Sequence, residues 1–160
     1  MMPFRGRFTR RAGGAIVHFE HPPIPDVIRF SGADWRAKRE FHVTLAGTTM
    51  MRALTPDADD VIKRAARQLA FTIVPREEFW HVRENETRAI IRMCDVEGAE
   101  KFFERMEKEM QMAIARPPYH VTLYTIGTLR GIGLPARADL ERLGEEIISP
   151  ERAVMMSVIQ

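Results

Sequence analysis

Two copies of one short phrase constrain this chain more than any other feature of its sequence. The first copy is Phe41-His42-Val43-Thr44-Leu45, and the second is Tyr119-His120-Val121-Thr122-Leu123. Side chains along a β-strand alternate between its two faces. If each phrase is a strand, its histidine and threonine share one face, and its aromatic residue, valine and leucine share the other. The pattern therefore predicts two strands that each present an imidazole and a hydroxyl on one side and enter a core with the other.

The segments that flank the two phrases are also alike. Each phrase is followed by a loop and then by a predicted helix, over residues 56–70 and 139–148 respectively. A long amphipathic helix over 95–115 leads into the second phrase, and a weaker helical turn within 33–40 precedes the first. This order is typical of a diverged internal duplication. It predicts an α+β fold with two lobes, each an antiparallel sheet plus a helix, related by a pseudo-twofold axis across a central cleft.

The remaining elements follow from local signals. Thr55 is a suitable N-cap for the first predicted helix, with Pro56 at its first position and Asp57 in its first turn. Short runs of apolar and β-branched residues between turn signals predict further strands. These are expected over residues 15–19, 27–30, 71–74, 78–83, 87–93 and 153–159.

The first thirteen residues differ in composition from the rest of the chain. They contain Arg5, Arg7, Arg10 and Arg11, and no acidic residue occurs before Glu20. Such a segment is typical of a flexible terminus, of an organellar transit peptide, or of a basic tail that contacts phosphates. We expect residues 1–13 to be a flexible basic tail and residues 14–160 to form a single bilobal domain.

Charge, cysteine content and hydropathy limit the class of protein. The net charge of +2 is too small to indicate a dedicated DNA-binding protein. Cys94 is the single cysteine, so no internal disulfide can form, which suits a reducing compartment. No apolar run approaches the roughly 18 residues that a membrane span requires. We therefore expect a cytoplasmic protein with no membrane partner, and a monomer because one chain supplies the whole cleft.

Two imidazoles and two hydroxyls on facing strands suit one kind of chemistry. An unperturbed histidine has a pKa of about 6.5, so near neutral pH it can act as a base or as an acid. A neutral histidine can take a proton from an attacking water while a protonated one gives a proton to the leaving oxygen. Hydroxyls can donate to the non-bridging oxygens of a phosphate. This predicts acid–base phosphoryl transfer that needs no metal and no cofactor.

The paired phrases resemble the two His-x-Thr motifs of the two-histidine (2H) phosphoesterase superfamily. That group includes the RNA 2′,3′-cyclic phosphodiesterases and the bacterial proteins called 2′-5′ RNA ligases. Both motifs are intact, as His42-Val43-Thr44 and His120-Val121-Thr122. The stretch 129–134, Leu-Arg-Gly-Ile-Gly-Leu, is also similar to an RNA-repair-like branch. The order of elements matches the superfamily over residues 15–148, but only the motifs are specific.

The resemblance implies a bilobal α+β fold and a metal-independent phosphodiesterase. The substrate would be a 2′,3′-cyclic phosphate or a related RNA or nucleotide phosphodiester. His42 and His120 would be the catalytic base and acid, in an order that the sequence leaves open, and Thr44 and Thr122 would hold the phosphate. Ligation of RNA through a 2′-5′ bond, and a non-catalytic nucleotide- or RNA-binding protein on the same fold, are the alternatives. A mononucleotide, an RNA end, a 2′-5′ oligomer and a cyclic ribose phosphate all stay open as substrates.

Other polar residues carry weaker signals. Tyr124 falls on the face of His120 by alternation, where it would either stack on a base or lie at the rim. Arg130 would either clamp a phosphate through its guanidinium or be a solvated loop arginine. His18 and His21, with Glu20 between them, have a spacing that metal pairs also show, but the loop prolines that follow do not favour a metal site.

Overall fold

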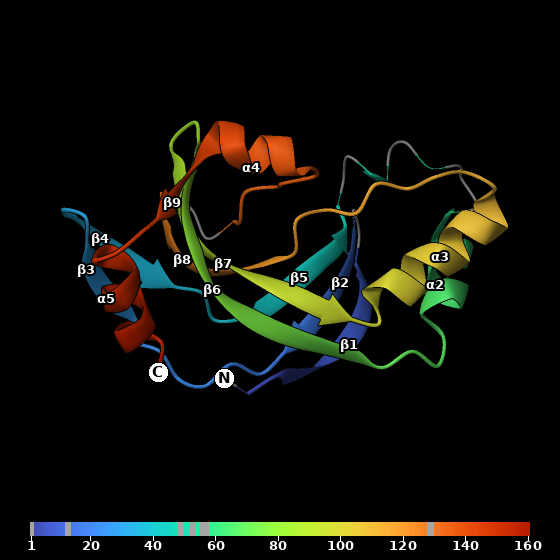
Figure 1. Ribbon diagram of the computed structural model, residues 1–160, viewed down its shortest axis with the longest axis horizontal. Helices are drawn as coiled ribbons and strands as arrows, with labels where there is room; N and C mark the ends of the chain where they lie inside the picture. The colour runs from blue at the N-terminus through green and yellow to red at the C-terminus, as the bar shows by residue number, and fades with distance from the viewer. Residues whose placement is uncertain (1, 12–13, 48–49, 52–53, 55–57, 128–129) are drawn as a thin grey trace.

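The computed structural model describes residues 2–11, 14–47, 50–51, 54, 58–127 and 130–160 (Figure 1). It is a mixed α+β chain with a mostly antiparallel sheet, so the predicted fold class is confirmed at this level. The elements are β1 (Phe4–Arg11), β2 (Gly14–Phe19), β3 (Val27–Phe30), β4 (Ala33–Ala37), β5 (Phe41–Ala46), α2 (Ala58–Ala66), β6 (Phe71–Glu84), β7 (Thr87–Glu97), α3 (Ala99–Met110), β8 (His120–Ile126), α4 (Arg137–Leu143), β9 (Gly144–Ile147) and α5 (Glu151–Val158).

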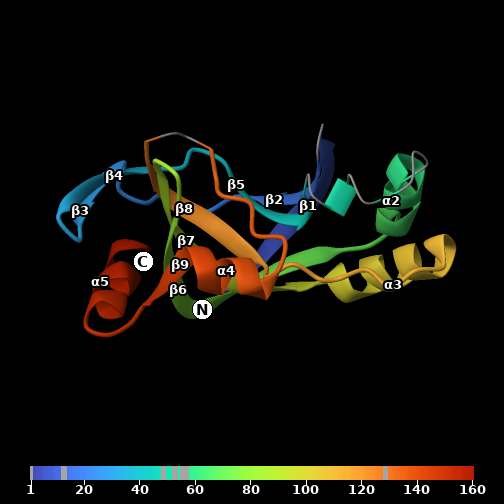
Figure 2. The ribbon, with the colours of Figure 1, turned by 90° about the horizontal axis from the view of Figure 1, so that it is seen from above.

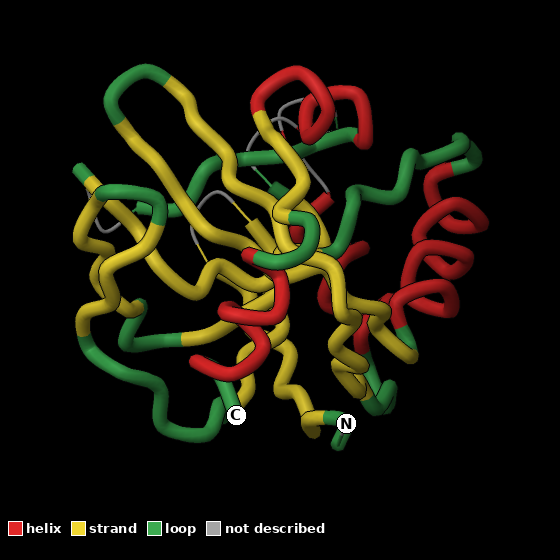
Figure 3. The backbone as a smooth tube through the Cα atoms, turned by 60° about the vertical axis from the view of Figure 1, so that its left-hand side comes forward, coloured by secondary structure: helices red, strands yellow, loops and turns green. Residues whose placement is uncertain are grey.

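The strands of the described residues belong to one sheet, with the order β3-β4-β8-β5-β2-β1-β6-β7 and with β9 paired to β6. Strand β8 also pairs with β7 along its length, while β5 and β4 share its other edge. Strands β8, β5, β2, β1, β6 and β7 therefore pair in a closed ring, whose curvature Figure 3 shows. This pairing joins both halves of the chain in one sheet, so the two-lobed arrangement stays a prediction.

A single large apolar cluster receives side chains from every strand of the ring. Val17, Val43 and Ile73 are fully buried in it, and Val121 and Cys94 nearly so. Helices α2 and α3 lie side by side at one end of the sheet, and α5 lies near β3 and β4 at the other end, as Figures 1 and 2 agree. The ring of strands thus encloses the main core, to which α2, α3 and α5 add apolar side chains, whereas α4 packs through Leu140 into a separate cluster.

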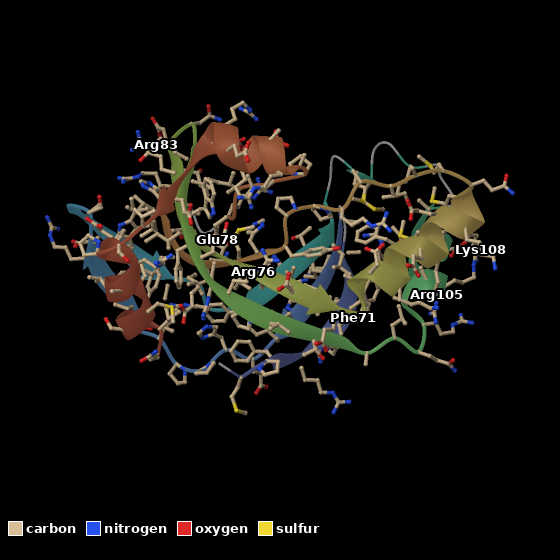
Figure 4. All side chains as sticks on the ribbon, viewed as in Figure 1. Phe71, Arg76, Glu78, Arg83, Arg105 and Lys108 are labelled. Atoms are coloured by element: carbon tan, nitrogen blue, oxygen red, sulfur yellow. The ribbon has the colours of Figure 1, made fainter. Side chains whose placement is uncertain are left out.

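Helix α3 is fixed to the ring by aromatic packing. Phe102 of α3 lies 5.8 Å from Phe8 and 6.4 Å from Phe71, measured between ring centroids. Arg105, labelled with Phe71 in Figure 4, donates a hydrogen bond of 2.9 Å to the carbonyl of Arg67 beyond the end of α2. These contacts hold α2 and α3 together against the core.

The prediction of a flexible tail over residues 1–13 is wrong for residues 4–11, which form β1. This strand pairs with β2 on one side and with β6 on the other, so it completes the ring. Phe4 and Phe8 alternate with exposed arginines, and both pack against the core. The arginine content concealed this period-two pattern, which is the ordinary signal of a half-buried strand.

Both His-x-Thr phrases are strands, as predicted, and so are residues 15–19 and 27–30. The predicted helical turn within 33–40 is wrong, because residues 33–37 form β4. Ser31 and Gly32 both have positive φ, 51° and 76°, which allows a two-residue hairpin turn between β3 and β4. The indole of Trp35 then donates to the carbonyl of Phe30 at 2.9 Å.

The other boundaries differ where the sheet extends further than local signals indicated. Residues 95–97 continue β7, so α3 begins only at Ala99, after Gly98 with its φ of 91°. The strand beginning at Phe71 does not end at Pro75, because a register shift between Pro75 and Phe79 accommodates the proline.

The C-terminal predictions are partly wrong. The helix predicted over 139–148 is α4 followed by β9, because residues 144–147 pair with β6. Most of the strand predicted over 153–159 is helix α5, in which Met155 is buried, and Ile159 is buried at the C-cap four residues later. The predicted start of the first helix, at residues 55–57, lies outside the described residues, and α2 ends at Ala66 rather than near residue 70.

In the part of the chain that the structure describes, no helix has the length and apolar character needed to cross a membrane.

We expect the Gly6→Ala variant to unfold more easily than the wild type. A Cβ at Gly6 would collide with Cγ1 of the fully buried Val17 and would lie 3.0 Å from Cδ1 of Ile73. Overpacking of this kind costs about 1–3 kcal/mol. Urea denaturation of the variant measures the loss, and Gly133→Ala, where an added Cβ meets nothing within 4 Å, is the control. Equal midpoints for Gly6→Ala and the wild type would contradict the packing of β1 in the ring.

Candidate active site

The two phrases lie on neighbouring antiparallel strands. Val43 of β5 is the register partner of Val121 of β8. Counting outward from that pair, an antiparallel register sets His42 opposite Thr122 and Thr44 opposite His120. Because the two valines face the core, the two imidazoles and the two hydroxyls share the opposite face of the sheet.

Each phrase ends in a β-bulge at its leucine. Ala15 and Ile16 of β2 pair with Ala46 and Thr44, which leaves Leu45 as the extra residue of β5. In the same way Ile90 and Ile91 of β7 pair with Tyr124 and Thr122, which leaves Leu123 as the extra residue of β8. A bulge interrupts the alternation of faces. The residue after each leucine therefore no longer lies on the face of the histidine.

The prediction that Tyr124 lines the site is wrong for this reason. Its side chain is fully buried, and its hydroxyl donates a hydrogen bond of 3.0 Å to the carbonyl of Pro25. Burial raises the pKa of this hydroxyl to about 12. Tyr124 is a core residue that anchors the proline loop, and alternation from His120 could not reveal the bulge at Leu123.

His42 lies in a half-buried and electropositive environment. Burial lowers its pKa to about 4, and the positive charges of His18, Lys38, Arg11 and His120 act in the same direction. Its Nδ1 is buried and has no hydrogen-bond partner among the described residues. The imidazole of His42 is therefore neutral at pH 7 and able to accept a proton.

The imidazole of His120 is oriented by a hydrogen bond to the backbone of Pro118. Its Nδ1 lies 3.0 Å from the carbonyl oxygen of Pro118. A carbonyl can only accept, so Nδ1 carries the hydrogen and Nε2 is left to exchange a proton with a ligand. Burial lowers the pKa of His120, and the hydrogen bond to Pro118 opposes part of that shift because it favours the charged form.

The segment after β8 folds back over Thr122. A Cβ built on Gly131 would lie 3.3 Å from Oγ1 of Thr122, so this backbone passes directly above the hydroxyl. Ile132 and Leu134 anchor the segment in a second apolar cluster, which also contains Trp80, Val82, Ala89, Ile91, Met93 and Leu140. The exposed Arg130 precedes Gly131, so its backbone lies beside the covered threonine, while residue 129 lies outside the described residues.

His18 belongs to the same face and was not assigned to this site from the sequence. It is the register partner of His42, and the two rings are 5.8 Å apart at 68°. His21 lies elsewhere, 4.8 Å from the ring of Phe41. The described residues contain no group of three or more His, Cys, Asp or Glu side chains that could hold a metal. Only the pairing of β2 with β5, a contact between distant residues, places His18 at the site.

The charges around the histidines favour an anion. Arg11 and Lys38 lower the pKa of His42, and Arg7 and Arg11 lower that of His18 after burial. Glu40 opposes them in part, and it pairs with Arg11 at 3.3 Å. An anion between the two imidazoles would relieve this repulsion and would accept hydrogen bonds from both threonines. The arrangement suits the binding of a phosphate and the transfer of protons on two sides of it.

Comparison with known proteins gives no match to a family model, to a curated protein or to a solved structure.

We expect the stability of the protein to fall between pH 6.5 and pH 4 because of His42. The pKa of His42 is about 4 when folded and 6.5 in its ordinary state, so the unfolded chain binds a proton that the folded chain does not. The contribution of His42 to the free energy of unfolding is fully present above pH 6.5. It is lost as the pH falls toward 4, by up to roughly 3 kcal/mol. Urea denaturation of the wild type and of His42→Asn at several pH values isolates this contribution. A difference between the two proteins that does not change with pH would contradict the depressed pKa.

Proposed function

We propose that the protein is a metal-independent 2H phosphodiesterase that hydrolyses a 2′,3′-cyclic phosphate or a related RNA or nucleotide phosphodiester. One observation supports this above all others: the Val43–Val121 pair sets two His-Thr motifs against each other on one face of the sheet. The match of both motifs to the paired motifs of the 2H phosphoesterases gives the chemistry to which this geometry is suited.

The proposal includes the finer arrangement of that superfamily. One lobe would be built around β5 and the other around β8. A pseudo-twofold axis would relate the two lobes, and the motif face would form the central cleft between them. The equivalent bulges at Leu45 and Leu123 support this correspondence, because they continue the likeness of the two strands beyond the motifs. All four motif side chains come from one chain, so the proposed site is complete in a monomer. A cytoplasmic location remains part of the proposal.

In the proposed mechanism His42 is the base and His120 is the acid. An attacking water gives a proton to His42 as its oxygen bonds to phosphorus. The bond from phosphorus to one ribose oxygen breaks, and that oxygen takes the proton of His120. The hydroxyls of Thr44 and Thr122 donate to the non-bridging oxygens, where negative charge accumulates.

The assignment of the two roles follows from their surroundings. Burial, assisted by neighbouring cationic groups that include Arg11 and Lys38, lowers the pKa of His42 to about 4, so its imidazole stays neutral as a base must. His120 donates through Nδ1 to Pro118, a bond that favours its charged form. A bound phosphate adds a negative charge beside the imidazoles and raises the pKa of His120 further. The protonated acid is therefore formed chiefly in the complex with substrate.

We expect the dependence of kcat/KM on pH to be bell-shaped and centred on the acid side of neutrality. The acid limb reports protonation of the base and should lie near pH 4, the pKa of His42. The basic limb reports loss of the acid's proton and should lie below pH 6.5, because burial lowers the pKa of His120. The basic limb of kcat should lie at higher pH than that of kcat/KM. A rate that rises steadily above pH 7 would contradict these roles.

We expect His42→Ala and His120→Ala each to reduce kcat/KM on the four 2′,3′-cyclic nucleotides by about 10²- to 10⁴-fold, the usual contribution of one acid or base. Thr44→Val and Thr122→Val should cost less, roughly 10- to 100-fold, because each removes one hydrogen bond to a charged group. EDTA should leave the wild-type rate unchanged. His81→Gln, which removes another half-buried histidine, is the matched control and should retain activity.

Two outcomes would overturn the proposal. Activity that survives either histidine substitution would rule out two-histidine chemistry. No turnover of any cyclic phosphate, on nucleotides or on oligoribonucleotides, with RNA binding retained, would instead favour a non-catalytic binding protein.

A further inference from the structure

The face that carries the motifs continues across two more strands. His18 of β2 is paired with His42 on one side and with Arg7 of β1 on the other. The three side chains therefore form one row, perpendicular to the strands. Neighbouring strands are about 4.8 Å apart, so Arg7 and His42 are separated at the backbone by roughly 10 Å. The row therefore extends the polar face of the motifs two strands beyond β5.

A broad open cavity begins where this row ends. It has a volume of about 1030 Å³ and lies between β1, the end of β2 and residues 39–41. Arg7, Arg11 and His18 line it on the side of the motif face. The cavity thus adjoins the candidate active site through His18, whose ring contacts that of His42.

Aromatic rings line the other side of the cavity. His21 lies 4.8 Å from Phe41 and 5.5 Å from Phe4, and Phe4 lies 5.1 Å from Phe19. Phe4, Phe41 and His21 are half-buried, so each retains an accessible part. Ring faces beside arginines are the combination that binds single-stranded nucleic acid, because bases stack and phosphates pair with guanidinium groups.

The charge of the cavity is unbalanced. Arg5, Arg7, Arg11 and Arg39 line it, together with the two acids Glu20 and Glu40. Arg11 is engaged with Glu40 at 3.3 Å. Within the residues that the structure describes, Arg5, Arg7 and Arg39 have no carboxylate within 4.0 Å. Guanidinium groups without an acidic partner, gathered around a concave surface, favour a polyanion.

We propose that this cavity binds the nucleotide adjoining the reactive phosphodiester, with Arg7 and His18 contacting its phosphate and the Phe4–His21–Phe41 cluster contacting its base. The substrate is then a single-stranded oligoribonucleotide rather than a mononucleotide. This inference rests on the proposed phosphodiesterase function and names the substrate class of the same site.

The test compares two substrates that share the reactive group. One is a 2′,3′-cyclic mononucleotide, and the other is a tetraribonucleotide that ends in the same cyclic phosphate. Arg7→Gln removes the guanidinium at the far end of the row. Arg83→Gln is the matched control, since Arg83 (Figure 4) is also an exposed strand arginine but lies outside the cavity.

We expect the wild type to prefer the tetranucleotide. Arg7→Gln should lower kcat/KM for the tetranucleotide about 10-fold, mainly through KM, because one hydrogen bond to a charged group is lost. It should lower the mononucleotide rate much less, so that the preference for the tetranucleotide falls, whereas Arg83→Gln should change neither rate. Binding of a fluorescent tetranucleotide with a 3′-phosphate, followed by anisotropy, gives a readout that does not need turnover, and Arg7→Gln should weaken it by the same factor.

The outcomes separate the two proposals. Hydrolysis of both substrates at equal rates, or an Arg7→Gln variant that binds and cleaves the tetranucleotide like the wild type, overturns the inference and leaves the phosphodiesterase proposal intact. Loss of anisotropy binding in Arg7→Gln, with no hydrolysis of either substrate by the wild type, overturns the phosphodiesterase proposal and supports the cavity as a nucleic-acid site.

Discussion

The pairing of Val43 with Val121 is the contact on which the rest of the structure depends. It is the one register pair between β5 and β8 among the described residues, and it closes the ring of six strands. The same pair fixes the positions of both His-Thr motifs, because the side chains on either side of each valine must lie on the opposite face. The same strand pairing therefore determines both the closed sheet and the position of the candidate site. The two valines point into the core, so burial of apolar area secures the geometry of the polar face.

The electrostatics of the site follow from where the polar face lies. Half-burial disfavours charge on His42, and the cations of β1, β2 and the segment before β5 disfavour it further. Glu40 pairs with Arg11 and offsets part of this positive charge, and a bound anion would offset more of it. The N-terminal strand has a double role in this respect. Its apolar side completes the core through Phe8, and its charged side extends the motif face through Arg7.

The sequence was most informative where chemistry and periodicity coincide. The two phrases are rich in β-forming residues and alternate cleanly, so their strands and the shared side of histidine and threonine could be predicted. Tyr124 could not be placed, because a bulge leaves no local signature at Leu123. His18 was missed as a site residue because the pairing of β2 with β5 is a tertiary contact. The arginines of residues 4–11 resemble a flexible tail in composition, although Phe4 and Phe8 alternate with them as in a half-buried strand. Local signals also could not show that residues 144–147 would find a partner in β6 rather than extend α4.

The pairing of β5 with β8, which closes the ring, has a consequence for folding. Strands β5 and β8 are separated in sequence by α2, β6, β7 and α3, and β1 is separated from β6 by β2 to β5 and α2. Contacts between residues so distant in sequence form slowly, because the chain loses the entropy of loop closure before the contact can stabilise the fold. The pair that assembles the two histidines is thus expected to form late, after the β6–β7 hairpin and the local β3–β4 hairpin. Appearance of the site would then coincide with completion of folding, and partly folded chains would lack it entirely.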